Sequence, residues 1–367
     1  MNLSDHEKLP SVVIHKPEKS ISFIDAAQDP RYTPVKNLLD SIFVNSRSAA
    51  FLIIRHDSII YERYAPGFTE STILPSNSMA KSFTGSLVAI ALEEQKIKSL
   101  AEPITNYLPE LAGRDKRFHD ITIQHLLDMR SGLDFKEGKY DYYDQSIRLS
   151  LRPNIEKHLL RATIARPPGI FRYQSINTQL LGLIVQRAVQ QPLYQYFEEK
   201  IWKPMGAAHN ATWNVDSRRN RHVLTSAGLN ATPRDFARFG RLYLHDGRFG
   251  DQQVVPSSWV KTISSIDTMH VYRGYKNQWW SKMASQTFIS EAEADEFVQN
   301  VSFSGGVRNN QSTYRVMFRI EAFNAIGFMN QTIFVYPSKD LLIIRLGKAW
   351  THTDTFNQFI YNLGEAL

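Results

Sequence analysis

The stretch that decides the fold is "PSNSMAKSFTGSLVAIALEEQKI", residues 75–97, in which a polar loop leads into a run of helix formers. The run is apolar over its first three turns and charged only near its end, so we expect a buried helix from Lys81 to Ile97. Ser78 and Lys81 are three residues apart at the start of this helix, which places their side chains on one face. A hydroxyl and an amine together there fit a nucleophile and its base.

The same residues have a simpler interpretation, an N-cap serine followed by a solvated lysine. The pattern S-x-x-K is short, and about one or two matches arise by chance in a chain this rich in serine and lysine. A second match runs from Ser258 to Lys261 and follows Pro256, where a surface helix is expected to begin. The spacing alone therefore leaves both interpretations open.

Catalysis by Ser78 requires Lys81 to accept a proton, which an ammonium group cannot do unless its pKa falls. The apolar turns after Lys81 favour burial of its side chain. The helix N-terminus disfavours an ammonium ion and favours an oxyanion. The backbone N–H of Ser78 would be one natural donor to that oxyanion.

The composition excludes several classes of function. The 367 residues include 43 Lys and Arg against 36 Asp and Glu, but the basic residues are spread along the chain, so we expect no nucleic-acid partner. The absence of cysteine excludes disulfides, thiol catalysis and thiolate metal sites. There is no apolar run of about 18 residues, so no membrane span is expected. The start of the chain lacks a secretion signal, which favours the cytoplasm, or the periplasm or exterior if a leader was removed.

Strand patterns lie near both ends of the chain and helical patterns lie between them. We expect hairpins at residues 49–64 and 331–347, the second turning at Pro337 to Asp340, and a closing helix at 354–363. The central patterns predict helices at 121–135 and 177–207, and residues 281–310 read as a loop.

The expected fold class is α/β of the α+β type, with one antiparallel sheet built from both chain ends, flanked by helices, beside an inserted helix-rich lobe. Residues 1–48 would form a leader and N-terminal segment, 49–120 and 215–367 the sheet domain, and 121–214 the helical lobe. A cleft between the two parts is the expected place for an active site.

Several landmarks in a fixed order resemble the serine hydrolase family that contains class C β-lactamases, penicillin-binding DD-peptidases, related esterases and aminohexanoate-dimer hydrolases. The resemblance covers most of the chain, from about Ala49 to Gly347. It rests on "FLIIRHDSIIYERYAPGFTESTILPSNSMAKS" (51–82), "ITIQHLLDMRSGL" (121–133), "PPGIFRYQSINTQLLGLIVQ" (167–186), "SAGLNATPRDFARFGRLYLHDGRFGDQQVVPSSWV" (226–260), "GYKNQWW" (274–280) and "FNAIGFMNQTIFVYP" (323–337).

The resemblance implies that Ser78 is the acylated nucleophile and Lys81 its partner. The second motif of the family looks like Tyr173-Gln174-Ser175 here, and Tyr173 would share a proton with Lys81 as base and acid. A phenol can serve so only if nearby positive charge lowers its pKa. Without the resemblance, Tyr173 is more simply an aromatic residue that fills a junction. Ser175 replaces the commoner asparagine, as in the aminohexanoate-dimer hydrolase branch, which moves the expected substrate away from β-lactams.

The third motif looks like Ala325-Ile326-Gly327, which lacks the Lys or His found in β-lactamases, so we expect a poor β-lactamase. Gly327 would permit close backbone approach, with Ile326 beside the substrate, and the N–H of Phe328 would be the second oxyanion donor. A competing placement, residues 304–306, lacks the strand and the proline turn.

The segment 136–146 holds candidates for substrate contact, although each of them is more simply an ordinary loop residue. The candidates there are Tyr140, Asp141, Tyr143 and Asp144. Trp279 and Trp280 could wall an apolar pocket or pack beneath the sheet. His125 lies in an apolar helical pattern and fits a core position, and no pair of histidines has metal-ligand spacing. We therefore expect no metal and no cofactor.

The sequence thus predicts a metal-free serine hydrolase that acts on a small-molecule linear amide or small ester. Two alternatives stay open. A non-catalytic ligand-binding protein could keep the fold without the chemistry, as the missing cation of the third motif suggests. A peptidoglycan DD-peptidase would require export.

Overall fold

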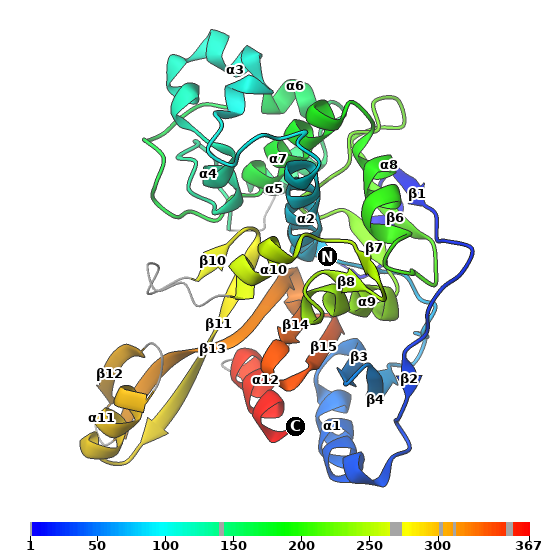
Figure 1. Ribbon diagram of the computed structural model, residues 1–367, viewed down its shortest axis with the longest axis vertical. Coiled ribbons are helices and arrows are strands. Elements are labelled where there is room, and N and C mark those ends of the chain that lie inside the picture. Colours follow the sequence, from blue (N-terminus) through cyan, green and yellow to red (C-terminus); the bar gives the residue numbers. More distant parts are fainter. Residues whose placement is uncertain (1, 139–142, 265–273, 301–303, 311–312, 350–354) are drawn as a thin grey trace.

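The computed structural model describes residues 2–138, 143–264, 274–300, 304–310, 313–349 and 355–367 (Figure 1). Its centre is a sheet with strands from both chain ends, in the order β10-β11-β13-β14-β15-β3-β4-β2, with β12 paired to β13. Every pair is antiparallel except β2 with β4. The strands are β2 (Ile24–Asp25), β3 (Ser48–Arg55), β4 (Ser58–Tyr64), β10 (Tyr275–Lys276), β11 (Trp279–Phe288), β12 (Ser304–Asn310), β13 (Thr313–Gly327), β14 (Gln331–Tyr336) and β15 (Leu341–Gly347).

The two expected hairpins are confirmed as β3–β4 and β14–β15. Their turns contain residues in the left-handed region, His56 and Asp57 (φ 48° and 56°) in the first and Asp340 (φ 47°) in the second. Short polar residues tolerate this conformation better than the β-branched residues of the strands. The expected sheet from both chain ends is therefore correct.

Apolar layers cover both faces of this sheet, because alternate residues of a strand point to opposite sides. Phe51 and Ile53 of β3 join one buried cluster with α1 (Thr33–Asn45) and α12 (Thr355–Ala366). Leu52 and Ile54 join a larger cluster with α2 (Ala80–Glu93) and α9 (Pro233–Leu244). β3 and β15 are consequently apolar over almost their whole length.

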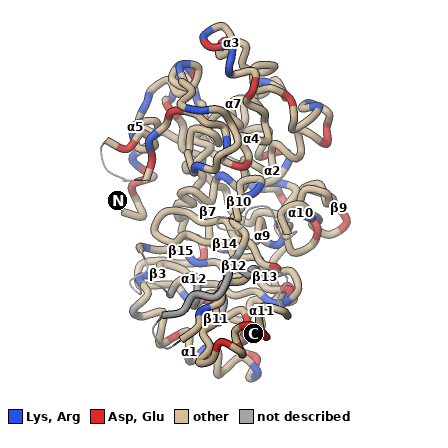
Figure 2. The backbone as a smooth tube through the Cα atoms, turned by 90° about the vertical axis from the view of Figure 1, so that its left-hand side faces the viewer, with Lys and Arg blue, Asp and Glu red and all other residues tan. Residues whose placement is uncertain are grey.

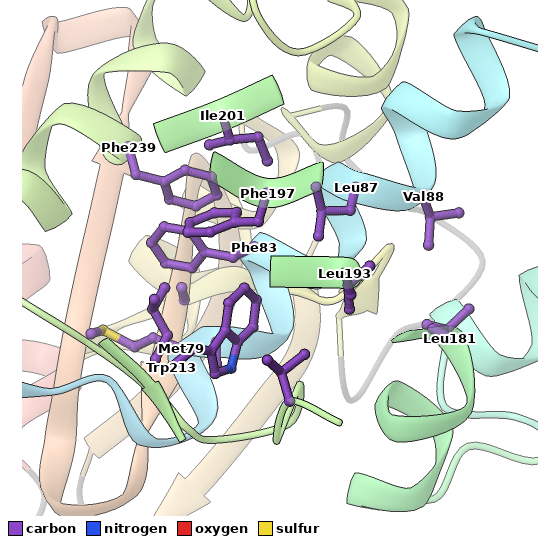
Figure 3. Packing of buried hydrophobic residues seen from close by; sticks show 14 of the residues in the cluster. Met79, Phe83, Leu87, Val88, Leu181, Leu193, Phe197, Ile201, Trp213 and Phe239 are labelled. Atoms are coloured by element: carbon purple, nitrogen blue, oxygen red, sulfur yellow. The ribbon is translucent and has the colours of Figure 1, made fainter. Parts of the chain in front are cut away.

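The predicted helix after Ser78 is confirmed as α2, and it ends at Glu93, shortly before Gln95 in the left-handed region (φ 57°). Its first twelve residues are buried. The ring of Phe83 stacks on that of Phe239 at 3.6 Å between centroids, and Phe197 packs on it edge-on (Figure 3). This aromatic cluster fixes the first turns of α2 and hence the position of Lys81.

The middle of the chain is helix-rich (Figure 1). Both long helical predictions there were too long. The first yields only α4, because Met129 and Gly132 take positive φ. The second breaks after α7, at Gln190 (φ 57°) and Pro192. The helices are α3 (Pro109–Arg114), α4 (Ile123–Leu127), α5 (Gln145–Ser150), α6 (Ile155–Leu159), α7 (Ser175–Val189), α8 (Leu193–Phe197) and a π-helical turn (Glu198–Trp202).

A second, four-stranded sheet joins distant parts of the chain in the order β1-β6-β7-β5. β1 (Ser11–Ile14) pairs with β6 (Ala211–Asn214), and β7 (Leu229–Ala231) pairs with β5 (Leu74–Pro75). β5, at the edge of the sheet opposite to β1, leads directly to Ser78. The expected domain boundaries stay a prediction.

The loop expected at residues 281–310 is wrong. Most of β11, together with α11 (Glu291–Asn300) and β12, lies there, and these elements extend away from the main body with β13 (Figure 1). β11 pairs with β13 from Trp280 opposite Asn324 to Phe288 opposite Tyr314, with a bulge after Ser281. The sequence of β11 alternates poorly and its partner strand is distant in the chain, so local pattern did not predict it.

The remaining elements are small and lie between the helical part and the far strands. α10 (Ser257–Ser264) follows a two-stranded ribbon of β8 (Arg248–Phe249) and β9 (Gln252–Gln253). Basic and acidic residues are interspersed along the chain (Figure 2). In the part of the chain that the structure describes, no helix is both long and apolar enough to cross a lipid bilayer.

Candidate active site

Ser78 lies in a 3-10 turn, η3 (Asn77–Met79), between β5 and α2. Asn77 takes a positive φ of 48°, which turns the chain sharply just before the serine. The end of β13 lies against this turn: a Cβ on Gly327 would come within 2.3 Å of the Ser76 carbonyl oxygen and 3.1 Å of the Ser78 nitrogen. Only glycine fits at such a contact with backbone atoms.

Lys81 points back at Ser78, with its Nζ 3.0 Å from the Ser78 Oγ. The same Nζ donates to the carbonyl of Ser226 at 2.9 Å. Burial lowers the pKa of Lys81 to about 8, and the negative charge of Glu137 opposes that shift. A substantial fraction of the amine is therefore neutral slightly above pH 7, in hydrogen-bond reach of the hydroxyl.

Tyr173 lies close to Lys81, whose Nζ is 5.0 Å from the centre of the phenol ring. The ring stacks on Trp280 at 5.5 Å and meets Tyr275 edge-on at 5.7 Å. Burial raises the pKa of Tyr173, a hydrogen bond with Ser78 offsets part of this, and Glu137 raises it further. The condition that nearby positive charge lowers the pKa of Tyr173 is not met, because burial and the negative charge of Glu137 raise it.

Ser175 begins α7 and its hydroxyl is held by Glu137. Its Oγ donates to the Glu137 Oε1 at 2.7 Å, and its backbone N–H donates to the other carboxylate oxygen. The carboxylate thus caps the N-terminus of α7, a favourable place for negative charge. Sequence reasoning missed Glu137, which lies 38 residues before its partner.

The predicted oxyanion segment follows β13. Ile326 pairs with Thr332 of β14 and is half-buried, and Phe328 begins a short 3-10 turn, η7 (Phe328–Asn330). The Nδ2 of Asn77 donates to the carbonyl of Phe328 at 3.0 Å, which ties this turn to the one that carries Ser78. The backbones of Ser78 and Phe328 therefore lie side by side, as two oxyanion donors require.

The four candidates for substrate contact in the segment 136–146 differ in their surroundings. Tyr140 and Asp141 lie outside the described residues. Tyr143 is exposed. Asp144 is buried and caps α5, because its carboxylate accepts the N–H and the hydroxyl of Ser146 at 2.8 and 2.6 Å.

The two tryptophans lie in different surroundings. Trp279 is buried and packs on Tyr243 at 4.4 Å between ring centres. Trp280 stacks on Tyr173 and so forms part of the wall around the candidate site. His125 lies in α4, where its Nδ1 accepts the N–H of Thr122 in a capping box.

The alternative placement of the third motif and the second S-x-x-K match lie on other elements of the fold. Residues 304–306 are in β12, which pairs with the outer part of β13, where Ser304 faces Phe318. Ser258 and Lys261 are both exposed on α10. Within the described residues, no group of three or more His, Asp or Glu side chains is placed to hold a metal ion.

Comparison with known proteins places this geometry in a family. The sequence model described as Beta-lactamase matches residues 42–356, most of the chain. The chain belongs to the Beta-lactamase family. Members of the Beta-lactamase family similar to this chain are named as hydrolases, which confirms the expected class of serine hydrolase and the resemblance on which it rested.

Two curated relatives and one solved structure are similar to this member of the Beta-lactamase family. The 6-aminohexanoate-dimer hydrolase of Paenarthrobacter ureafaciens is 26% identical over 317 residues, which cover 83% of this chain and 74% of that protein. Esterase EstB of Burkholderia gladioli is 30% identical over 178 residues, 43% of this chain and 45% of that one. A protein of Bacillus anthracis, provisionally named 6-aminohexanoate-dimer hydrolase, superposes with a TM-score of 0.74 at 24% identity, covering 100% of this chain and 92% of that one.

Proposed function

We propose that the protein hydrolyses a linear amide or a small ester through an acyl-enzyme on Ser78. The observation that carries this proposal is the buried Lys81 amine, 3.0 Å from the Ser78 hydroxyl and with its pKa lowered to about 8. A serine hydroxyl needs a base within hydrogen-bond reach to become a nucleophile. The relatives named as an amide-dimer hydrolase and an esterase support the choice of substrate class.

The proton path follows from the pKa directions at the site. The neutral amine of Lys81 accepts the Ser78 proton while the Oγ attacks the substrate carbonyl. Tyr173, whose pKa is raised, stays a phenol, which suits it to donate its proton to the leaving amine or alcohol. The Lys81 ammonium then returns a proton to Tyr173, and water releases the acyl group by the reverse path.

The developing oxyanion would be held by the N–H groups of Ser78 and Phe328. Their backbones lie on the two turns that the Asn77 to Phe328 hydrogen bond joins. Donors fixed in this way cost no reorganisation when charge develops. Loss of one such donor in serine hydrolases costs about 10²–10³ in kcat.

We expect poor activity on β-lactams, because Ala325 occupies the place of the third-motif cation and is buried in β13. No ammonium or imidazole side chain is then offered from this position to the substrate carboxylate. A linear ester or amide without that carboxylate does not need the cation.

The test is a substrate comparison on purified protein: p-nitrophenyl acetate, a linear N-acyl anilide and a chromogenic cephalosporin. The expected result is measurable kcat/KM on the ester and the anilide, with the cephalosporin slower by about two orders of magnitude or more. Cephalosporin turnover equal to that of the ester would overturn the substrate assignment. Absence of turnover on all three would favour a ligand-binding protein on the same fold.

A further inference from the structure

A cavity of about 380 Å³ opens beside the turn that carries Ser78. Its lining includes Asn77, which directly precedes Ser78, and Met329, which directly follows Phe328. These two turns are the ones joined by the Asn77 to Phe328 hydrogen bond. The cavity therefore reaches both backbone segments proposed to hold the oxyanion, and its volume is in the range of small-molecule pockets.

Apolar side chains from three separate segments line this cavity. Ile147 of α5 and Leu151 just after it form one side, Leu224 a second, and Leu9 of the N-terminal segment a third. Leu151 is 61% exposed, and Phe328 next to Met329 is 36% exposed. Large apolar side chains exposed around a cavity are typical of a ligand site rather than of ordinary surface.

The N-terminal segment lines one side of the cavity, and its carboxylate and ammonium groups there are paired. The side-chain amide of Asn214 donates to the His6 carbonyl at 2.9 Å, which holds the turn η1 (Asp5–Lys8) in place. Asp5 and Lys8, the acid and the lysine that line the cavity, pair with each other at 2.7 Å. A neutral ligand is therefore favoured over an ionic one.

We propose that this cavity receives the acyl chain of the substrate, an unbranched, uncharged and apolar chain. This inference rests on the proposed function, because it takes the scissile carbonyl to be at Ser78. It adds the substrate's acyl part to that function and gives the N-terminal segment a role in specificity.

The test measures kcat/KM for p-nitrophenyl esters of straight-chain acids from acetate to decanoate. Each methylene that enters the cavity is expected to raise kcat/KM about three- to four-fold until the cavity is full, after which the value falls. A flat or steadily falling profile would overturn the assignment.

A variant separates the cavity from general effects of chain length. Ile147→Trp narrows the cavity from α5 and is expected to lower the octanoate-to-acetate ratio of kcat/KM about ten-fold or more. Val44→Trp, on the exposed face of α1 (70% exposed), is the control and should leave that ratio unchanged. An unchanged ratio in Ile147→Trp contradicts the assignment.

The two proposals fail in different ways. If wild type hydrolyses no ester, acetate included, the proposed function falls and this inference with it. If acetate is hydrolysed by Ser78 but chain length has no effect, only the cavity assignment falls.

Discussion

Two serine–lysine pairs with the same spacing lie in this chain, Ser78 with Lys81 and Ser258 with Lys261. Lys81 is 1% exposed and donates to Ser78, whereas both members of the second pair are exposed on α10. Burial is what lowers the pKa of Lys81 to about 8. The comparison shows that the S-x-x-K pattern only brings the serine and the lysine close together. Burial in the surrounding core is what makes the lysine able to act as a base.

The difference originates in how the two helices pack against the rest of the protein. The apolar turns of α2 insert among Phe197, Phe236 and Phe239, so the lysine enters the interior with the helix. α10 buries Trp259 and Val260 and leaves its serine and lysine in water. The pair on α10 therefore has the spacing of the first pair without its burial.

Replacing the two serines should give the largest contrast. Ser78→Ala is expected to lower kcat/KM for ester hydrolysis by about three orders of magnitude or more, because the attacking atom is lost. Ser258→Ala should stay within about two-fold of wild type. Thermal unfolding of both variants checks that the fold is retained, and equal activity of wild type and a folded Ser78→Ala would falsify the nucleophile assignment.

Replacing the two lysines should give a contrast nearly as large. Lys81→Met removes the base and is expected to cost about 10²–10⁴ in kcat/KM, the range of general-base catalysis. Methionine is unbranched and apolar, so it suits the buried position. Lys261→Met, at an exposed position, is the matched control and should change activity less than about two-fold. Equal losses in the two variants would mean that the environment of Lys81 has no catalytic role.

The pH dependence of kcat/KM should show a smaller effect than the serine and lysine replacements. Because Lys81 must be neutral to act, kcat/KM is expected to rise about ten-fold per pH unit below the pKa of Lys81, which is about 8, and to level off above it. Glu137 raises the pKa of Lys81, so Glu137→Gln should move the rising part of the pH profile of kcat/KM to lower pH.

The control for this shift is Glu93→Gln, an exposed position twelve residues after Lys81 on the same helix. It lies about 18 Å further along α2, beyond the Debye length at physiological salt. The rising part of the pH profile of kcat/KM should not move in this variant. A shift to higher pH in Glu137→Gln would contradict the electrostatic role given to Glu137.

The sequence predicted those parts of the fold that local pattern determines. The hairpins at 49–64 and 331–347 have apolar strands and polar turns within one short stretch, and α2 has an uninterrupted apolar run. β11 was missed because its polar residues are ordered by pairing with β13, not by a pattern of its own. The helices at 121–135 and 177–207 were drawn too long because left-handed residues such as Met129 and Gln190 carry no clear sequence signal.

In the candidate site, too, the sequence predicted some features and could not predict others. Ser78 and Lys81 are close in sequence, and the family resemblance added Tyr173 and Gly327, which the structure places around them. Glu137 and the direction of the Tyr173 pKa depend on contacts between segments that only the folded chain brings together. Spacing can propose a nucleophile, but its electrostatic surroundings have to be seen in the structure.

The central claim is that Ser78, and not Ser258, is an activated nucleophile. The most direct measurement is the intact-protein mass after incubation with a fluorophosphonate, on wild type, Ser78→Ala and Ser258→Ala. We predict one adduct on wild type and on Ser258→Ala, and none on Ser78→Ala. A folded wild type that gains no adduct, or an adduct that persists in Ser78→Ala, would contradict the account.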